Sequence, residues 1–293
     1  MNVLSGKLAS WLGGLTGDHR HTAVGVLLAD ARLSAKLRRR KLVDPTYAFT
    51  VLYRLPEVRA ALRRGGVEPR DVDAILDQLV DDDDLYTDAD DEPTYAPALD
   101  RLVAASRVGG KVRLAPFLRA LGGALPPALA FARAPLVAAS EDLDRAIDAP
   151  LAHQADGSIT LAGWEAPVQR VIALAQIVAD RSEGSFTVNP EHALLAAAIS
   201  PDFKELLTRR GLGLAQVEAH FAVVAGRRAG RLSRPVRYRP AGERVVASLS
   251  FHTLLVRAER FAGDDRRDVT LGHLLAALRE EEDLREVIDR MDL

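Results

Sequence analysis

The strongest constraint on the fold is a stretch of sequence that occurs twice. Residues 43–67 and 188–212 align in one frame without a gap. The positions they share are helix-starting prolines, a helix-ending glycine, an arginine and apolar residues. Val43, Pro45, Ala48, Pro56, Leu62, Arg64 and Gly66 fall on Val188, Pro190, Ala193, Pro201, Leu207, Arg209 and Gly211. Because each position marks a cap, a stop or a core contact, their agreement in one frame indicates duplicated structure.

The second copy of this stretch predicts two short helices. Asn189 is a favourable N-cap residue, and Pro190 is favourable at the first position of a helix. Ser200 and Pro201 have the same roles at the start of the next helix. Residues 193–199 between them are almost wholly apolar, which predicts a helix buried on most sides. Gly211 is typical of the residue that ends a helix.

Two further copies fit the same frame. In residues 269–293, Thr270 is the expected N-cap and His273 takes the place of His192. Residues 95–121 form the weakest copy. Each repeat then consists of a long helix, a loop, a short buried helix and, in most copies, a third helix. The sequence therefore predicts four repeats in two pairs.

Composition favours an all-α protein of two domains. Hydrophobic residues make up 48% of the chain and aromatic residues only 5%, while alanine, leucine and arginine dominate. We expect an N-terminal tail at 1–19, a first domain at 20–139, a linker at 140–162 and a second domain at 163–293. An acidic loop at 81–92 joins the first pair of repeats, and an arginine-rich loop at 226–239 joins the second.

Charge and cysteine content exclude several classes of protein. The formal charge of −2 argues against a globally basic nucleic-acid binder. The absence of cysteine excludes disulfides and thiolate metal sites. No stretch has the apolar length that spans a bilayer, and the first residues lack the pattern of a signal peptide. We therefore expect a soluble, cytoplasmic protein without a membrane partner.

The sequence shows no catalytic constellation, so we expect no enzymatic activity, no cofactor and no metal. The metal-binding HExxH and the nucleophile motif G-x-S-x-G are both missing. Gly109-Gly110-Lys111 comes nearest to the phosphate-binding motif G-x-x-x-x-G-K-[ST]. It lacks a first glycine at the required spacing and the Ser or Thr hydroxyl that would bind magnesium, so a loop between helices explains it better. His19 and His21 lie beside Asp18, but we interpret their closeness as incidental and not as a metal site. His192 and His273 are expected to be hydrogen-bonded in the core.

Two of the repeats resemble a known family. Residues 189–195, NPEHALL, and 270–278, TLGHLLAAL, are similar to the G-T-E-H-L-L-L-A-L signature that opens the buried helix of each Clp-N repeat. Tyr95–Leu99 and Leu249–Phe251 resemble the start of the second half of that domain. The resemblance covers about residues 22–135 and 164–293. It implies two tandem double Clp-N domains, each of two pseudo-symmetric helical repeats, without the AAA+ ATPase modules of the Clp unfoldases.

The resemblance implies a protein-binding function. A Clp-N-like module is expected to act as an adaptor or regulator of proteolysis that holds peptides or partner proteins in grooves between its repeats. Its partners would be a Clp-type unfoldase, the substrates of that unfoldase or other adaptors. Some members receive phosphorylated arginine on signature glutamates. The matching positions here are Thr46, Ala115, Glu191 and Gly272, and they are the candidate residues for binding a peptide or partner protein. Thr46, Ala115 and Gly272 are expected to be exposed in the first turns of their helices. With one glutamate among the four positions, stabilisation of the helix dipole explains Glu191 better.

An alternative function uses the arginine-rich loop. Its arginines are Arg227, Arg228, Arg231, Arg234, Arg237 and Arg239, and they have the charge to neutralise several phosphates of a nucleic acid. Only Tyr238 supplies an aromatic ring for stacking, so a solvated linker is the commoner explanation. The acidic and basic loops also have opposite charge at corresponding places, which raises the hypothesis that they pair.

Overall fold

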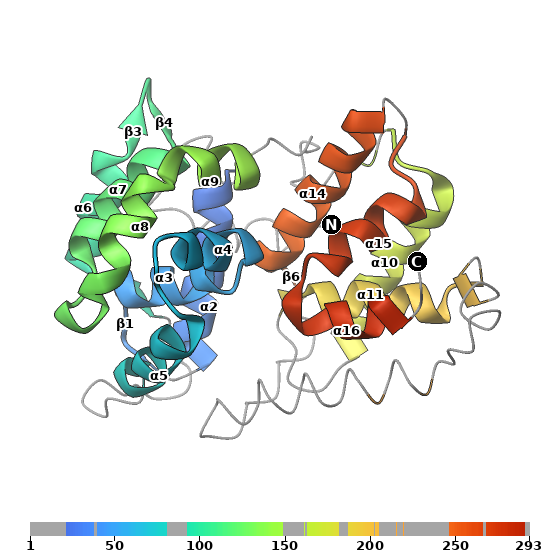
Figure 1. Cartoon of the computed structure of the whole chain (residues 1–293), viewed down its shortest axis with the longest axis horizontal. Coiled ribbons are helices and arrows are strands. Elements are labelled where there is room, and N and C mark those ends of the chain that lie inside the picture. Colours follow the sequence, from blue (N-terminus) through green and yellow to red (C-terminus); the bar gives the residue numbers. More distant parts are fainter. Residues whose placement is uncertain are drawn as a thin grey trace, which may run out of the picture. The chain divides into compact units, whose positions relative to one another are not determined.

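The computed structural model divides the chain into two compact units, Met1–Pro150 and Leu151–Leu293 (Figure 1). It describes residues 22–37, 40–80, 93–148, 161, 163–181, 187–201, 203, 204, 215, 219, 246–265 and 268–290. These residues are mostly helical, and the strands among them are two residues long. The prediction of an all-α protein is confirmed.

Unit one contains two pairs of packed helices. Its elements, in order, are α2 (Ala23–Leu37), β1 (Leu42–Val43), α3 (Pro45–Tyr53), α4 (Pro56–Arg64), α5 (Pro69–Val80), β2 (Thr94–Tyr95), α6 (Pro97–Ala105), β3 (Arg107–Val108), β4 (Lys111–Val112), α7 (Leu114–Ala124), the 3-10 helix η3 (Pro127–Ala132), α8 (Arg133–Ala138) and α9 (Ser140–Ile147). Helix α2 packs on α3, and α6 packs on α7. The pairs are joined by β1 and β2, which run parallel with Leu42 opposite Thr94 and Val43 opposite Tyr95.

The short helix α3 begins where the sequence predicts. The carboxylate of Asp44 accepts hydrogen bonds from the backbone N–H groups of Thr46 at 2.9 Å and Tyr47 at 3.1 Å. Pro45 takes the first helical position, where its missing N–H costs nothing. Phe49 and Leu52 are fully buried. The polar cap and the apolar interior together fix the start of α3 and the face that it buries.

Gly109 and Gly110 form the turn of a β-hairpin between α6 and α7. Strands β3 and β4 are antiparallel, with Val108 opposite Lys111. The two glycines have φ angles of +59° and +81°, in the left-handed region that side chains disfavour. The sequence indicated only a loop here, because two-residue strands give no visible alternation of apolar and polar residues.

Unit two repeats the arrangement of unit one. Its described elements are α10 (Ala166–Arg181), β5 (Thr187–Val188), α11 (Pro190–Ile199), β6 (Val246–Ala247), α14 (Leu249–Asp265), α15 (Leu271–Arg279) and α16 (Glu282–Arg290). Helix α10 packs on α11, and α14 packs on α15. Strands β5 and β6 run parallel, and a second parallel bridge joins Trp164 to Val269. The residues before each short helix therefore pair with those before the long helix of the other half.

The segment predicted as a linker begins with a helix. Residues 140–147 form α9, which packs on α7, and its Leu143 and Ile147 are buried. The sequence around them is polar, so two apolar residues four positions apart were too weak a signal for the short helix. The division between the units, after Pro150, falls inside the range 140–162.

Histidines close the N-terminal turns of two short helices. The backbone N–H groups of Asn189 and Thr270 donate to Nδ1 of His192 and His273, at 2.9 and 3.0 Å. The hydroxyl of Thr270 accepts in return from the backbone N–H of His273 at 3.3 Å. The histidines occupy the position that glutamate or glutamine takes in a capping box. Both histidines are hydrogen-bonded as expected, but only His192 lies in the core, whereas His273 is partly exposed.

We predict that His273→Ala destabilises unit two by about 1 kcal/mol, the usual cost of a lost cap. His273→Glu restores an acceptor at the same position and is expected to recover most of this loss. The measurement is urea unfolding followed by tryptophan fluorescence in a Trp11→Phe background, in which Trp164 is the remaining tryptophan. A change at the exposed Ala276 of the same helix, Ala276→Gln, is the control. Equal stability of the alanine variant and the parent would rule out this role of the imidazole.

A buried ion pair ties together three elements of unit two. Nη1 of Arg257, on α14, donates to the backbone oxygen of Ala277 on α15 at 2.7 Å and to Oε1 of Glu281 at 3.1 Å. Arg257 and Glu281 are 3% and 8% exposed. Glu281 directly precedes α16, so the pair holds the turn between α15 and α16 against α14.

We predict that Glu281→Ala lowers the free energy of unfolding of unit two by about 3–5 kcal/mol, because it leaves the buried guanidinium without its carboxylate. Replacing both partners together, by Arg257→Met and Glu281→Leu, is expected to recover most of that loss, because no uncompensated charge remains. Urea unfolding of both variants measures this. A double variant no more stable than Glu281→Ala would show that the two side chains do not act as a pair.

Candidate functional site

The four positions that the resemblance singles out lie in the first turns of the short helices. Thr46, Ala115, Glu191 and Gly272 are each the second residue of their helix, α3, α7, α11 and α15. Gly272 is exposed and Thr46 is partly exposed, whereas Ala115 and Glu191 are 3% and 6% exposed. The positions are equivalent along the chain but differ in their access to a ligand.

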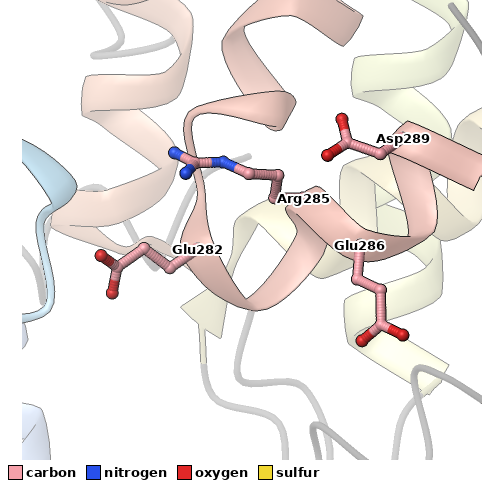
Figure 2. A pocket seen from close by; sticks show the side chains of 4 residues that line it. All are labelled: Glu282, Arg285, Glu286 and Asp289. Atoms are coloured by element: carbon pink, nitrogen blue, oxygen red, sulfur yellow. The ribbon is translucent and has the colours of Figure 1, made fainter.

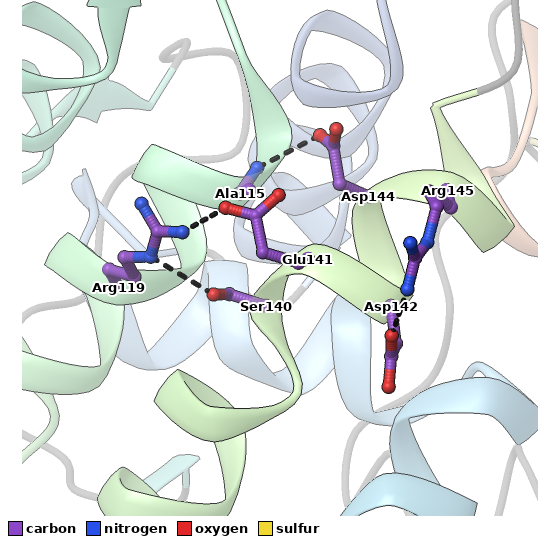
Figure 3. A network of polar contacts seen from close by, with 7 residues as sticks. All are labelled: Ala115, Arg119, Ser140, Glu141, Asp142, Asp144 and Arg145. Carbon is purple, nitrogen blue, oxygen red and sulfur yellow. Dashed lines mark hydrogen bonds and ion pairs between the residues drawn. The ribbon is translucent and has the colours of Figure 1, made fainter.

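Ala115 is the clearest departure from expectation, because it was predicted to be an exposed first-turn position. Its backbone N–H donates to Oδ1 of Asp144, on α9, at 2.9 Å (Figure 3). Arg113, the residue before α7, provides no side-chain cap of its own. The carboxylate of a neighbouring helix thus occupies the start of α7, and Ala115 is buried there rather than exposed.

Glu191 is the only carboxylate among the four positions. It lies in the first turn of α11, where a negative charge is favourable beside the N–H groups of a helix start. A guanidinium is best held by paired carboxylate oxygens, and the equivalent positions Thr46, Ala115 and Gly272 supply none. The position of Glu191 in the first turn of α11 therefore supports its role in stabilising the helix dipole. A phosphoarginine side chain would find only one carboxylate among these four positions.

Helix α9 fixes two other helices through carboxylates that sequence reasoning missed. Besides the bond from Asp144 to α7, Oδ1 of Asp148, directly after α9, accepts from the backbone N–H of Ala23 at 3.1 Å. That bond caps the start of α2 with a residue that lies 125 positions later in the sequence. On the same helix, Ser140 accepts from Nε of Arg119 at 3.1 Å, and Glu141 pairs with the same arginine (Figure 3).

Burial raises the pKa of Asp148 above its usual value of 3.8, and the nearby charge of Asp144 adds to the shift. The hydrogen bond from Ala23 and the charge of Arg113 act in the opposite direction and only reduce it. Between pH 3.8 and the raised pKa, the folded protein binds more protons than the unfolded chain. The contribution of Asp148 to stability is therefore full below pH 3.8 and is lost as the pH rises through the raised pKa.

We predict that Asp148→Asn gains stability relative to the parent as the pH rises from 3 to 7. The amide oxygen still accepts from Ala23, and the variant avoids the ionised, partly desolvated carboxylate. Asp148→Ala loses the cap at every pH and is expected to be about 1 kcal/mol less stable than the asparagine variant. Thermal unfolding midpoints across this pH range measure both differences. A gap between Asp148→Asn and the parent that moves the other way with pH would contradict the prediction.

Two further groups with a raised pKa also hold elements together. Burial raises the pKa of Tyr95 to about 12, and the hydroxyl donates to the backbone oxygen of Leu28 at 3.3 Å. Burial likewise raises the pKa of Glu259, which accepts from the indole N–H of Trp164 at 3.1 Å. A perturbed pKa in a cleft is a sign of catalysis. Here each perturbed group links a helix to another segment, so a structural role accounts for it.

A shallow depression lined by charged residues lies on α16. Its lining consists of Glu282, Arg285, Glu286 and Asp289 from this one helix (Figure 2). Nε of Arg285 donates to the backbone oxygen of Arg279 at 3.2 Å, and Asp289 pairs with Nε of Arg279 at 2.7 Å. These contacts bind the end of α15 to α16, and the depression is explained as the surface of that junction.

Several predicted features lie outside the described residues. They are the tail at 1–19 with His19 and His21, the acidic loop at 81–92, and the arginine-rich loop with Arg227, Arg228, Arg231, Arg234, Arg237 and Arg239. Within the described part of the chain, no three histidines or carboxylates gather as a metal site would require. Among the same residues, no helix combines the length and the apolarity needed to cross a bilayer.

Comparison with known proteins found no matching protein family, no similar curated protein and no similar solved structure.

Proposed function

We propose that this protein is a non-enzymatic protein-binding module of two tandem Clp-N-like domains, an adaptor or regulator that binds partner polypeptides of a Clp-type unfoldase system. The observation that carries the proposal is the repeated order of elements. A helix, a short extended segment and a second helix packed on the first occur four times, as α2 with α3, α6 with α7, α10 with α11 and α14 with α15. The first helix is the longer one in three of these pairs, whereas α6 has nine residues and α7 has eleven.

The pairing of the extended segments supports two pseudo-symmetric halves in unit two. The backbone N–H of Ser248 donates to the oxygen of Val188 at 3.0 Å, so the start of α14 is fixed beside the start of α11. In the other direction, the N–H of Glu165 donates to the oxygen of Val269 at 3.0 Å. Each half thus pairs the segment before its short helix with the segment before the long helix of the other half. A duplicated motif with pseudo-twofold symmetry is expected to show this reciprocal pairing.

The accessible first turns of α3 and α15 are the proposed contact sites. Thr46 and Gly272 are open to a partner, whereas Ala115 is covered by α9 and Glu191 is buried. A side chain at Gly272 would meet nothing closer than the Thr270 hydroxyl at 3.5 Å, so space for an approaching chain exists there. The candidate set of four thus reduces to one first turn in each unit.

The test is affinity capture from the native cell with the parent chain and with the variant Thr46→Lys, Gly272→Lys. Each lysine places a long charged side chain at an accessible first turn, so we expect recovery of the bound partner to fall by at least about tenfold, as at an interface hot spot. The control is Ala104→Lys on the exposed side of α6. Equal capture by all three proteins would reject these first turns as the contact sites.

Recovery of no unfoldase component, together with a gel shift of nucleic acid that is lost when Arg227, Arg228, Arg231 and Arg234 are replaced, would reverse the assignment. The arginine-rich loop would then be the functional element, and the helical units would serve as its scaffold.

A further inference from the structure

A long stretch of unit one carries basic side chains and no acidic ones. Residues 101–140 contain no aspartate or glutamate, although the whole chain has a formal charge of −2. Two of the basic residues serve the fold, because Arg119 pairs with Glu141 and Arg133 donates to a backbone oxygen. The others are exposed on α6, on the β3–β4 hairpin or directly after it, and they are Arg101, Arg107, Lys111 and Arg113.

The β3–β4 hairpin carries most of this exposed charge. Residues 107–111 are all exposed, and so is Arg113, which follows β4. Figure 1 shows β3 and β4 extending beyond the ends of α6 and α7. Arg107 and Lys111 form no ion pair with another described residue. Arg113 interacts electrostatically with Asp148. Together with Val108, these three cations make up what we call the hairpin surface.

The hairpin is anchored at its base and open at its tip. Ser106 and Val112 are 0% and 2% exposed. The backbone N–H of Arg113 donates to the backbone oxygen of Ser106 at 3.0 Å, which extends the strand pairing by one residue. A Cβ atom placed on Gly109 or Gly110 would meet no atom within 4 Å. The turn therefore has free space around it, while its base is held by the fold.

The strand register places an apolar side chain beside the cations. Val108 lies opposite Lys111, and Arg107 lies opposite the buried Val112. Because successive residues of a strand point to opposite faces, Val108, Lys111 and Arg113 share the face turned away from Val112. Val108 is 56% exposed, more than any other large hydrophobic residue in the described part of the chain. This face therefore offers a partner both positive charge and an aliphatic contact.

The combination favours an acidic peptide over a nucleic acid as the partner. Guanidinium groups bind carboxylates and phosphates alike through forked hydrogen bonds, so charge alone does not choose between them. A phosphate backbone would leave Val108 without an apolar contact, and residues 106–113 contain no aromatic ring on which a base could stack. A peptide with an aliphatic side chain between carboxylates complements the cations and Val108 together.

We propose that the hairpin surface binds an acidic segment of a partner protein, with Arg107, Lys111 and Arg113 facing its carboxylates and Val108 contacting an aliphatic side chain between them. The inference goes beyond the proposed function, because the hairpin is separate from the first turns at Thr46 and Gly272. Its test uses a defined peptide and leaves those two positions unchanged, so the two proposals can fail independently.

The test is fluorescence anisotropy with the full-length chain and a labelled peptide in which glutamates flank a single leucine. We expect Arg107→Glu combined with Lys111→Glu to weaken binding by at least about tenfold, because two attractions become repulsions. The matched control is Arg64→Glu with Arg70→Glu, which changes the net charge equally at exposed positions of α4 and α5 and should leave binding unchanged. Thermal unfolding midpoints equal to that of the parent check that both variants are folded.

The leucine of the peptide tests the role of Val108. Val108→Ser should weaken binding of the leucine peptide about fivefold, because an apolar contact is lost. The same substitution should not affect a peptide with serine in place of leucine. Failure of the parent chain to bind the leucine peptide at low salt would overturn the proposal, and so would binding that survives the hairpin charge reversals.

A single-stranded oligonucleotide of the same charge as the peptide distinguishes the other class of partner. If the oligonucleotide binds more tightly than the peptide, loses binding with the hairpin charge reversals and is unaffected by Val108→Ser, the hairpin surface is a phosphate-binding element and the proposal is overturned. Weaker binding of the oligonucleotide than of the leucine peptide is the result that we expect.

Discussion

The arrangement of the helices depends on short parallel pairings of backbone. In unit one, the N–H of Ala96 donates to the oxygen of Val43 at 3.0 Å, which sets the start of α6 beside the start of α3. In unit two, β5 and β6 do the same for α11 and α14. Two-residue strands have little stability alone. Their effect is to fix the register between halves whose helices are already packed on apolar faces.

The sequence predicted best where local chemistry decides structure. Asp44, Asn189 and Thr270 precede helices because their positions allow a side chain or a reciprocal bond to satisfy the N–H groups of a first turn. The prolines at the starts of α3 and α11 correctly predicted where these helices begin, and the apolar run of α11 correctly predicted its burial. The match between residues 43–67 and 188–212 carried these local signals from one unit to the other.

The sequence predicted least where distant residues decide structure. Asp144 and Asp148 act on Ala115 and Ala23, which are 29 and 125 positions away, and no local pattern marks such partners. For this reason Ala115 was expected to be accessible, and α9 was assigned to a linker. The pair of Arg257 and Glu281 is a similar case, because their burial is visible only once α14, α15 and the turn before α16 are packed.

The contrast between α7 and α15 shows how one repeated motif acquires different surfaces. Both helices start after an extended residue and lack an acidic side chain in the first turn. In unit one, the chain continues past α7 into η3, α8 and α9, and α9 returns a carboxylate to the α7 start. In unit two, Thr270 and His273 satisfy the first turn of α15 locally, and α16 packs beyond its other end. The start of α15 therefore needs no covering helix and stays open at Gly272. In unit one the extra elements close one first turn, and they expose Phe131 of η3 and Val137 of α8. Duplication supplied the helices, and the residues that follow α7 in unit one and α15 in unit two determine which surfaces remain for a partner.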